Sequence, residues 1–127
     1  MDFSNYLANK LISATVRGLP YTTPSNAYIA LYTDNPTKDD KGTEVVGPSY
    51  TRQELVANPP VDGVTNNASQ IDWATATTNW GNVTHIGIRD SGTTGSLLYF
   101  TKLENAKEIL TGDQFRINVN QLKLQLT

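Results

Sequence analysis

A chain of 127 residues is long enough for one domain with its own hydrophobic core, and a second domain is not expected at this length. Lys and Arg number 10 against 12 Asp and Glu, and the net charge of -2 argues against a protein that binds nucleic acid or an anionic membrane surface. The absence of Cys excludes disulfide bonds and thiolate metal sites. We therefore expect a single domain over residues 1–127, with no nucleic-acid partner and no membrane partner.

The first predicted element is a helix over residues 3–17. Its apolar side chains recur at spacings of three and four residues, and they are Phe3, Leu7, Leu11 and Ala14, with Tyr6 beside them. Asp2 or Ser4 is suited to the N-cap, and Gly18 to a left-handed C-terminal stop. We expect this helix, within residues 1–18, either to cover the open end of a sheet or to act as a detachable docking arm.

Neither a signal peptide nor a membrane span is expected. The amino-terminal stretch lacks a basic leader and is broken by polar residues, so it has no signal-peptide core. No segment approaches the roughly 20 apolar residues that a membrane span needs. These patterns predict a soluble protein that is made in the cytoplasm.

The pattern changes to a period of two after Pro24. In residues 27–33, Tyr28 and Tyr32 fall on one face and Ile29 and Leu31 on the other, which predicts a central strand with both faces occupied. The charged, Gly- and Pro-containing residues that follow predict a long exposed loop around a short strand at 44–46. A further strand is expected over residues 50–57.

Five more strand-like segments follow, each bounded by Gly, Asp, Ser or Asn. They cover residues 69–74, 82–90, 96–103, 113–119 and 121–127. About seven or eight short strands with no helices between them favour a mainly β fold, an antiparallel β-sandwich or jelly-roll-like barrel over residues 27–127.

The sequence offers little for catalysis. With one His and no Cys, a nucleophile-base pair would depend on His85, which we interpret as a strand residue bonded to a neighbour. Asp34, Asp39, Asp40 and Glu44 could gather around a calcium ion, but Lys38 and Lys41 dilute their charge and a solvated loop is favoured. We therefore assign no catalytic, cofactor-binding or metal-binding residue, no cofactor, and no enzymatic activity. A hydrolase with dispersed carboxylates stays open as a disfavoured alternative.

Several segments resemble a family of small tailed-bacteriophage virion proteins, whose members are commonly described as tail-fibre-like. The most specific is WGNVTHIGIRD (80–90), and the amino-terminal helix SNYLANKLISATVRG (4–18) is next; GDQFRINVNQLKLQLT (112–127) is another of these segments. The resemblance implies a non-enzymatic structural component of the virion. It leaves two placements open, a capsid decoration or cement protein and a tail-fibre or tail-appendage module. A receptor- or carbohydrate-binding module of a tail fibre is the alternative function.

A structural role requires interfaces with other capsid or tail subunits. The candidate interface residues lie on the helix and on the first long strand: they are Phe3, Tyr6, Leu7, Leu11, Tyr28 and Tyr32. Apolar side chains on both faces of that strand predict a homo-oligomer, or a protein that becomes ordered by docking on a virion lattice. The resemblance to phage surface proteins suggests a trimer, located in the virion after synthesis in the host cytoplasm.

Overall fold

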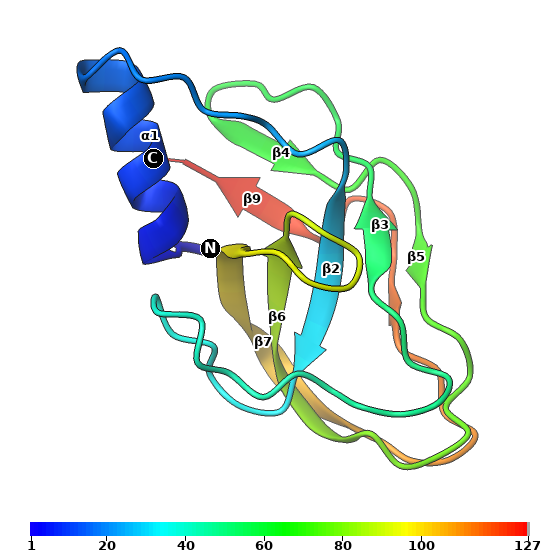
Figure 1. The fold of residues 1–127 in the computed structure, drawn as a ribbon. Helices are drawn as coiled ribbons and strands as arrows, with labels where there is room; N and C mark the ends of the chain where they lie inside the picture. The colour runs from blue at the N-terminus through cyan, green and yellow to red at the C-terminus, as the bar shows by residue number, and fades with distance from the viewer. Residues whose placement is uncertain (127) are drawn as a thin grey trace.

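The computed structural model describes residues 1–126 and is mainly β (Figure 1). Its one helix in this range is α1 (Asn5–Val16). The strands are β1 (Asp2–Phe3), β2 (Ala27–Tyr32), β3 (Gln53–Leu55), β4 (Val64–Asn66), β5 (Ile71–Asp72), β6 (Gly81–Arg89), β7 (Leu97–Ile109), β8 (Arg116–Ile117) and β9 (Lys123–Gln125). The predicted mainly β fold with a single amino-terminal helix is therefore confirmed, with nine strands where seven or eight were expected.

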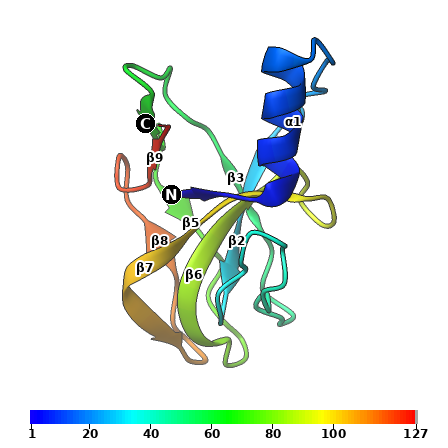
Figure 2. The ribbon, with the colours of Figure 1, turned by 90° about the vertical axis from the view of Figure 1, so that its left-hand side faces the viewer.

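The strands form two layers around the main core. The larger layer is a five-stranded antiparallel sheet in the order β1-β7-β6-β2-β3, and the pairs β4-β9 and β5-β8 make up the rest (Figure 2). Ile29 and Leu31 from β2 share one buried cluster with Ile71 of β5 and Phe115 beside β8. The core thus lies between the large sheet and the short pairs, as in a sandwich whose second layer is divided.

The helix begins later than the sequence predicts. Phe3 does not belong to it, because Asp2 and Phe3 pair with Phe100 and Tyr99 of β7 and form β1. The helix starts after Ser4, whose hydroxyl accepts a hydrogen bond from the Leu7 amide at 3.1 Å. The aromatic ring of Phe3 packs edge-on against Tyr99 instead of extending the helical stripe. A short strand therefore attaches the base of the helix to the sheet.

Most other differences concern short strands. The prediction of a central strand at 27–33 is confirmed, since β2 lies between β6 and β3. Residues 44–46 form a single bridge, Tyr32 to Glu44, instead of a strand. β4 was not predicted, and Thr127, the last residue of the expected strand over 121–127, lies outside the described residues.

Strict alternation fails along β6 and β7. A register shift separates the pairs Val83–Lys107 and His85–Lys102, so that Thr84 alone on β6 faces residues 103–106 on β7. Val83 and Ile86 consequently lie in the same buried cluster. Strict alternation in the sequence would predict His85 on the same face as Val83, but this bulge resets the alternation between them, and that prediction is wrong.

The loop after β2 is not simply exposed, as the sequence predicts. Pro36 is buried, and a Cβ at Gly42 would lie 2.7 Å from the Cα of Pro36 and 3.0 Å from the ring of Tyr32. Gly42 therefore allows the loop to fold against the outer face of β2. Part of the second face of β2 is thus covered by the chain itself.

Candidate functional site

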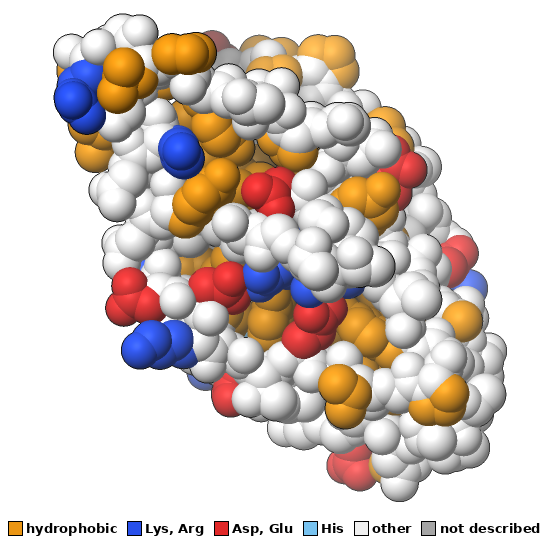
Figure 3. Space-filling view, in the orientation of Figure 1, with side chains coloured by type: hydrophobic (Ala, Val, Ile, Leu, Met, Phe, Trp, Pro, Cys, Tyr) orange, Lys and Arg blue, Asp and Glu red, His pale blue; other side chains and the backbone are white. Residues whose placement is uncertain are grey.

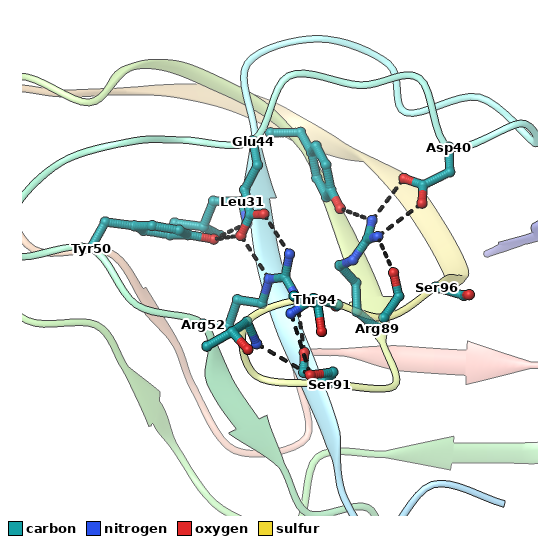
Figure 4. A network of polar contacts seen from close by, with 12 residues as sticks. Leu31, Asp40, Glu44, Tyr50, Arg52, Arg89, Ser91, Thr94 and Ser96 are labelled. Carbon is teal, nitrogen blue, oxygen red and sulfur yellow. Dashed lines mark hydrogen bonds and ion pairs between the residues drawn. The ribbon is translucent and has the colours of Figure 1, made fainter.

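A network of polar side chains joins this loop to the hairpin between β6 and β7 (Figure 4). Arg89, at the end of β6, is only 8% exposed and donates to both carboxylate oxygens of Asp40, at 2.7 and 2.9 Å. It also donates to the Tyr32 hydroxyl at 2.9 Å and to the Gly95 carbonyl at 2.8 Å. Asp40 has a φ of 58°, in the left-handed region that a short polar side chain tolerates. This turn directs its carboxylate to the guanidinium.

A second arginine completes the network. Arg52 makes a bidentate pair with Glu44, at 2.9 Å from Nε and 2.8 Å from Nη2. Its remaining nitrogen donates to the carbonyls of Ser91 and Thr94 at 2.9 and 2.8 Å. Tyr50 donates to Glu44 at 2.6 Å and accepts the Leu31 amide at 3.0 Å. The network therefore holds two loops and β2 in one arrangement.

The electrostatics of these groups stabilise their ordinary charge states. Burial opposes the charge of Glu44, but its hydrogen bonds from Arg52 and Tyr50 outweigh burial and lower its pKa. Burial and the bond to Glu44 raise the pKa of Tyr50. Burial opposes the charge of Arg89 as well, yet its bonds to Asp40 and Tyr32 raise its pKa. None of these three groups is poised to exchange a proton near neutral pH, so the cluster is suited to holding structure.

The four acidic residues of the loop have separate partners. Asp34 accepts hydrogen bonds from the backbone amide of Thr43 at 2.6 Å and from the Thr43 hydroxyl at 2.9 Å. Asp39 accepts a hydrogen bond from the side-chain amide of Asn5 at 2.7 Å. Asp40 and Glu44 bind the two arginines described above. Within residues 1–126, no group of three or more His, Asp or Glu side chains is placed to hold a metal ion.

His85 is half-buried and bonds to the neighbouring Thr84 hydroxyl through Nδ1 at 2.8 Å. Burial lowers its pKa, with a further contribution from Lys102. The local bond to Thr84 agrees with the interpretation of His85 as a strand residue bonded to a neighbour.

Two apolar surfaces are left uncovered in the single chain, and Figure 3 shows apolar side chains along the helix and the segment beside it. On α1, Ile12 is 57% and Val16 is 75% exposed, and Leu19 just beyond is exposed too. We call Ile12, Val16 and Leu19 the outer stripe. It lies away from Leu7, the one buried residue of α1, which packs toward β7.

The second uncovered surface lies on the β4-β9 pair. A hollow of about 350 Å³ is lined by Pro60, Gly63, Thr65, Leu124 and Leu126. Thr65 pairs with Leu124, and Leu126 falls on the same strand face two residues later. We call this hollow the β4-β9 groove. Its lining is almost wholly apolar, unlike the surface around the polar network.

The family model described as podophage GP4 fiber I protein gp80 matches residues 2–125, nearly the whole chain. The chain belongs to this family. This match confirms the predicted resemblance to tailed-phage virion proteins. It indicates that the chain is a virion-associated, fibre-like protein. A search of the curated proteins found no match.

The fiber I fold places the predicted interface residues in different environments. Leu7 and Tyr32 are buried within the chain, so a neighbour would reach them only if the chain opened. Phe3, Leu11 and Tyr28 are partly exposed. Tyr6 is exposed and lies under the Lys10 ammonium, 5.7 Å from its ring centroid. A role for these residues at an interface stays a prediction.

The sequence analysis predicted neither the outer stripe nor the β4-β9 groove of this fiber I family member. Ile12 and Val16 stand one helical turn apart, and this spacing could have indicated a second apolar face on α1. The alternation of Leu124 and Leu126 with Lys123 and Gln125 indicates one buried strand face. Only their pairing with β4 shows that this face forms a surface hollow. In addition, the helix of this chain is too short and too polar to cross a membrane, and residues 1–126 contain no other.

Proposed function

We propose that the protein is a non-enzymatic building block of a phage tail fibre that acts through protein-protein interfaces. The observation that carries this proposal is the fiber I family match over residues 2–125. It favours the fibre over a capsid decoration or cement role, the other placement that the sequence leaves open. The expected partners are other virion proteins and further copies of the chain.

The polar network supports a role without catalysis. Its carboxylates, Asp40 and Glu44, each accept two bonds from an arginine, and the Tyr50 hydroxyl is engaged by Glu44 and Leu31. A general acid or base needs a pKa near the working pH and access to a substrate proton. The shifts of Glu44 and Tyr50 move their pKa values away from neutrality. The geometry fits loop fixation.

Assembly as a homo-oligomer, with a trimer as the first expectation, is part of the same proposal. Ile12, Val16 and Leu126 are large apolar side chains that the single chain leaves exposed. Exposed apolar surface of this kind is typical of an interaction site. A carbohydrate-binding role has less support, because Tyr6 is the exposed large aromatic residue within residues 1–126, while Trp73 and Trp80 are buried.

Imaging of assembled particles tests the placement. Phage with a deletion of this gene, complemented by a copy carrying an epitope at the exposed residue Val46, would be compared with the uncomplemented deletion. We expect antibody label and fibre density on the tail only in the complemented particles. Label on the capsid lattice would favour the decoration role, and particles with complete fibres but no label would refute a virion role. Purified protein that cleaves envelope polysaccharide would refute the non-enzymatic part.

A further inference from the structure

The outer stripe and the β4-β9 groove lie too far apart in one molecule to cover each other. In Figure 2, α1 and the β4-β9 pair stand on opposite sides of the top of the molecule. Leu7 fixes the opposite face of the helix on the sheet, and β1 fixes its base. The stripe of one chain is therefore not available to the groove of the same chain. Both surfaces are open to a partner from outside.

We propose that the partner is a second copy of this chain, with the outer stripe of one copy seated in the β4-β9 groove of the next. This inference rests on the proposed function, because it names the surfaces that join copies within the fibre protein. It joins two different surfaces, so it can repeat around a closed ring such as the expected trimer.

The spacing of the apolar side chains fits this contact. Ile12 and Val16 lie four residues apart on a helix, which separates them by about 6 Å along its axis. Leu124 and Leu126 lie two residues apart on a strand, which separates them by about 7 Å. Because the two spacings are similar, the side chains of the stripe can interdigitate with those of the groove. The hollow of about 350 Å³ gives them room.

The charges of the two surfaces are complementary. Residues 3–33, which include the stripe, contain Lys10 and Arg17 and no acidic residue, whereas the groove has one acidic residue at its rim. Asp62 lies in the turn between the groove residues Pro60 and Gly63 and is exposed. Arg17 directly follows the stripe residue Val16. Neither Arg17 nor Asp62 forms an ion pair within residues 1–126, and a contact that seats the stripe in the groove brings the two to the same rim.

One basic side chain on the groove strand does not oppose this arrangement. Lys123 lies on β9, but strand alternation places it on the face opposite Leu124 and Leu126. The groove face itself is built from apolar side chains, Thr65 and the glycine backbone. A helix with two positive charges and an apolar stripe is thus matched by an apolar groove with Asp62 at its rim.

Cysteine cross-linking tests the contact directly, because the chain has no Cys of its own. Full-length Val16→Cys and Leu126→Cys proteins would be purified separately, mixed and oxidised mildly. We expect a disulfide-linked pair containing one chain of each kind, identified by mass spectrometry. The matched control mixes Val46→Cys with Leu126→Cys, since Val46 is 82% exposed and lies on neither surface. Equal yields from both mixtures would overturn the proposal.

Light scattering provides a second test that does not depend on disulfide geometry. The wild type should have the mass of an oligomer, and Ile12→Glu with Val16→Glu should weaken association by at least about tenfold, as expected when hot-spot residues are lost. Val46→Glu should leave the mass unchanged. Both variants alter exposed residues, so tryptophan fluorescence should confirm that they fold. A wild type that is monomeric at every concentration, or an oligomer that survives the helix substitutions, would overturn the proposal.

The two proposals fail in different ways. An oligomer that survives the helix substitutions, in a protein that antibody label still places on tail fibres, would refute the stripe-groove contact and leave the fibre role intact. Cross-linked copies that never label the virion would refute the fibre role and leave the contact intact.

Discussion

Replacing Arg89 by Leu should lower the stability of the fold by about 3 kcal/mol. The substitution keeps much of the aliphatic volume and removes four hydrogen bonds of 2.7–2.9 Å. Loss of one partner from a buried ion pair costs about 3–5 kcal/mol. The expected cost lies at the low end of that range, because the Asp40 side chain is 34% exposed and water can replace some of its hydrogen bonds. The buried Tyr32 hydroxyl loses the Arg89 donor, which contributes about 1–3 kcal/mol of the total.

Urea unfolding followed by tryptophan fluorescence measures this effect, since Trp73 and Trp80 are both buried in the core. A change of about 3 kcal/mol should also lower the melting temperature by about 10 °C. Arg116→Leu is the matched control, because Arg116 pairs with Asp72 at 2.6 Å on the surface and should leave the unfolding midpoint unchanged. Equal midpoints for the Arg89 variant and the wild type would refute the view that the network fixes the loops.

Three further outcomes follow from the same geometry. The pKa of Glu44 is lowered from 4.5 in the folded chain. The stability that its charge contributes is therefore complete above pH 4.5 and is lost as the pH falls through the folded pKa. Glu44→Gln should reduce this loss of stability at acid pH, which unfolding measured at several pH values would show. Gly87→Ala would place a Cβ 2.7 Å from Leu97 and 2.8 Å from Tyr32 and should cost about 1–3 kcal/mol, whereas Gly92→Ala, with its nearest contact at 3.4 Å, should cost less in the same urea titration. His85→Ala should leave fibre assembly intact, and particles that lose infectivity with unchanged protein stability and unchanged fibre content would revive an enzymatic role for His85.

The sequence predicts the elements whose signals are local. The Ser4 cap and the Gly18 stop bound α1 within two residues of the predicted range, and Gly18 has the expected positive φ of 66°. The alternation in residues 27–33 predicts β2 and its central position. Each of these signals depends on the residues of the element itself, so no knowledge of the tertiary fold is needed.

Other parts of the fold depend on residues distant in the chain. Phe3 fits the helical stripe as well as Leu7 does, and only Tyr99 on β7 shows that it pairs as a strand. The bulge at Thr84 is not visible in VTHIGIRD, because it arises from the extra residues 103–106 on the partner strand. Tertiary pairing overrides local pattern in both cases.

The polar network was beyond sequence reasoning for the same reason. Arg89 and Asp40 are separated by 49 residues, and the charged loop of Asp40 reads as solvated until its fold over Tyr32 is known. No sequence spacing predicts that two oppositely charged residues this far apart in the chain form an ion pair. The outer stripe differs, because the spacing of Ile12 and Val16 is visible in the sequence, but the apolar face of Leu7 is enough to predict the helix without it.

The bulge between β6 and β7 has a consequence for how copies are able to associate. Beyond Phe100, the outer edge of β7 has no partner strand within residues 1–126, and such an edge is a template for uncontrolled strand addition. Residues 103–106 distort this edge, and Lys102, Glu104, Lys107 and Glu108 place charges along it. A flat strand from another molecule would meet an irregular, charged border. Strand addition at this edge is thereby disfavoured.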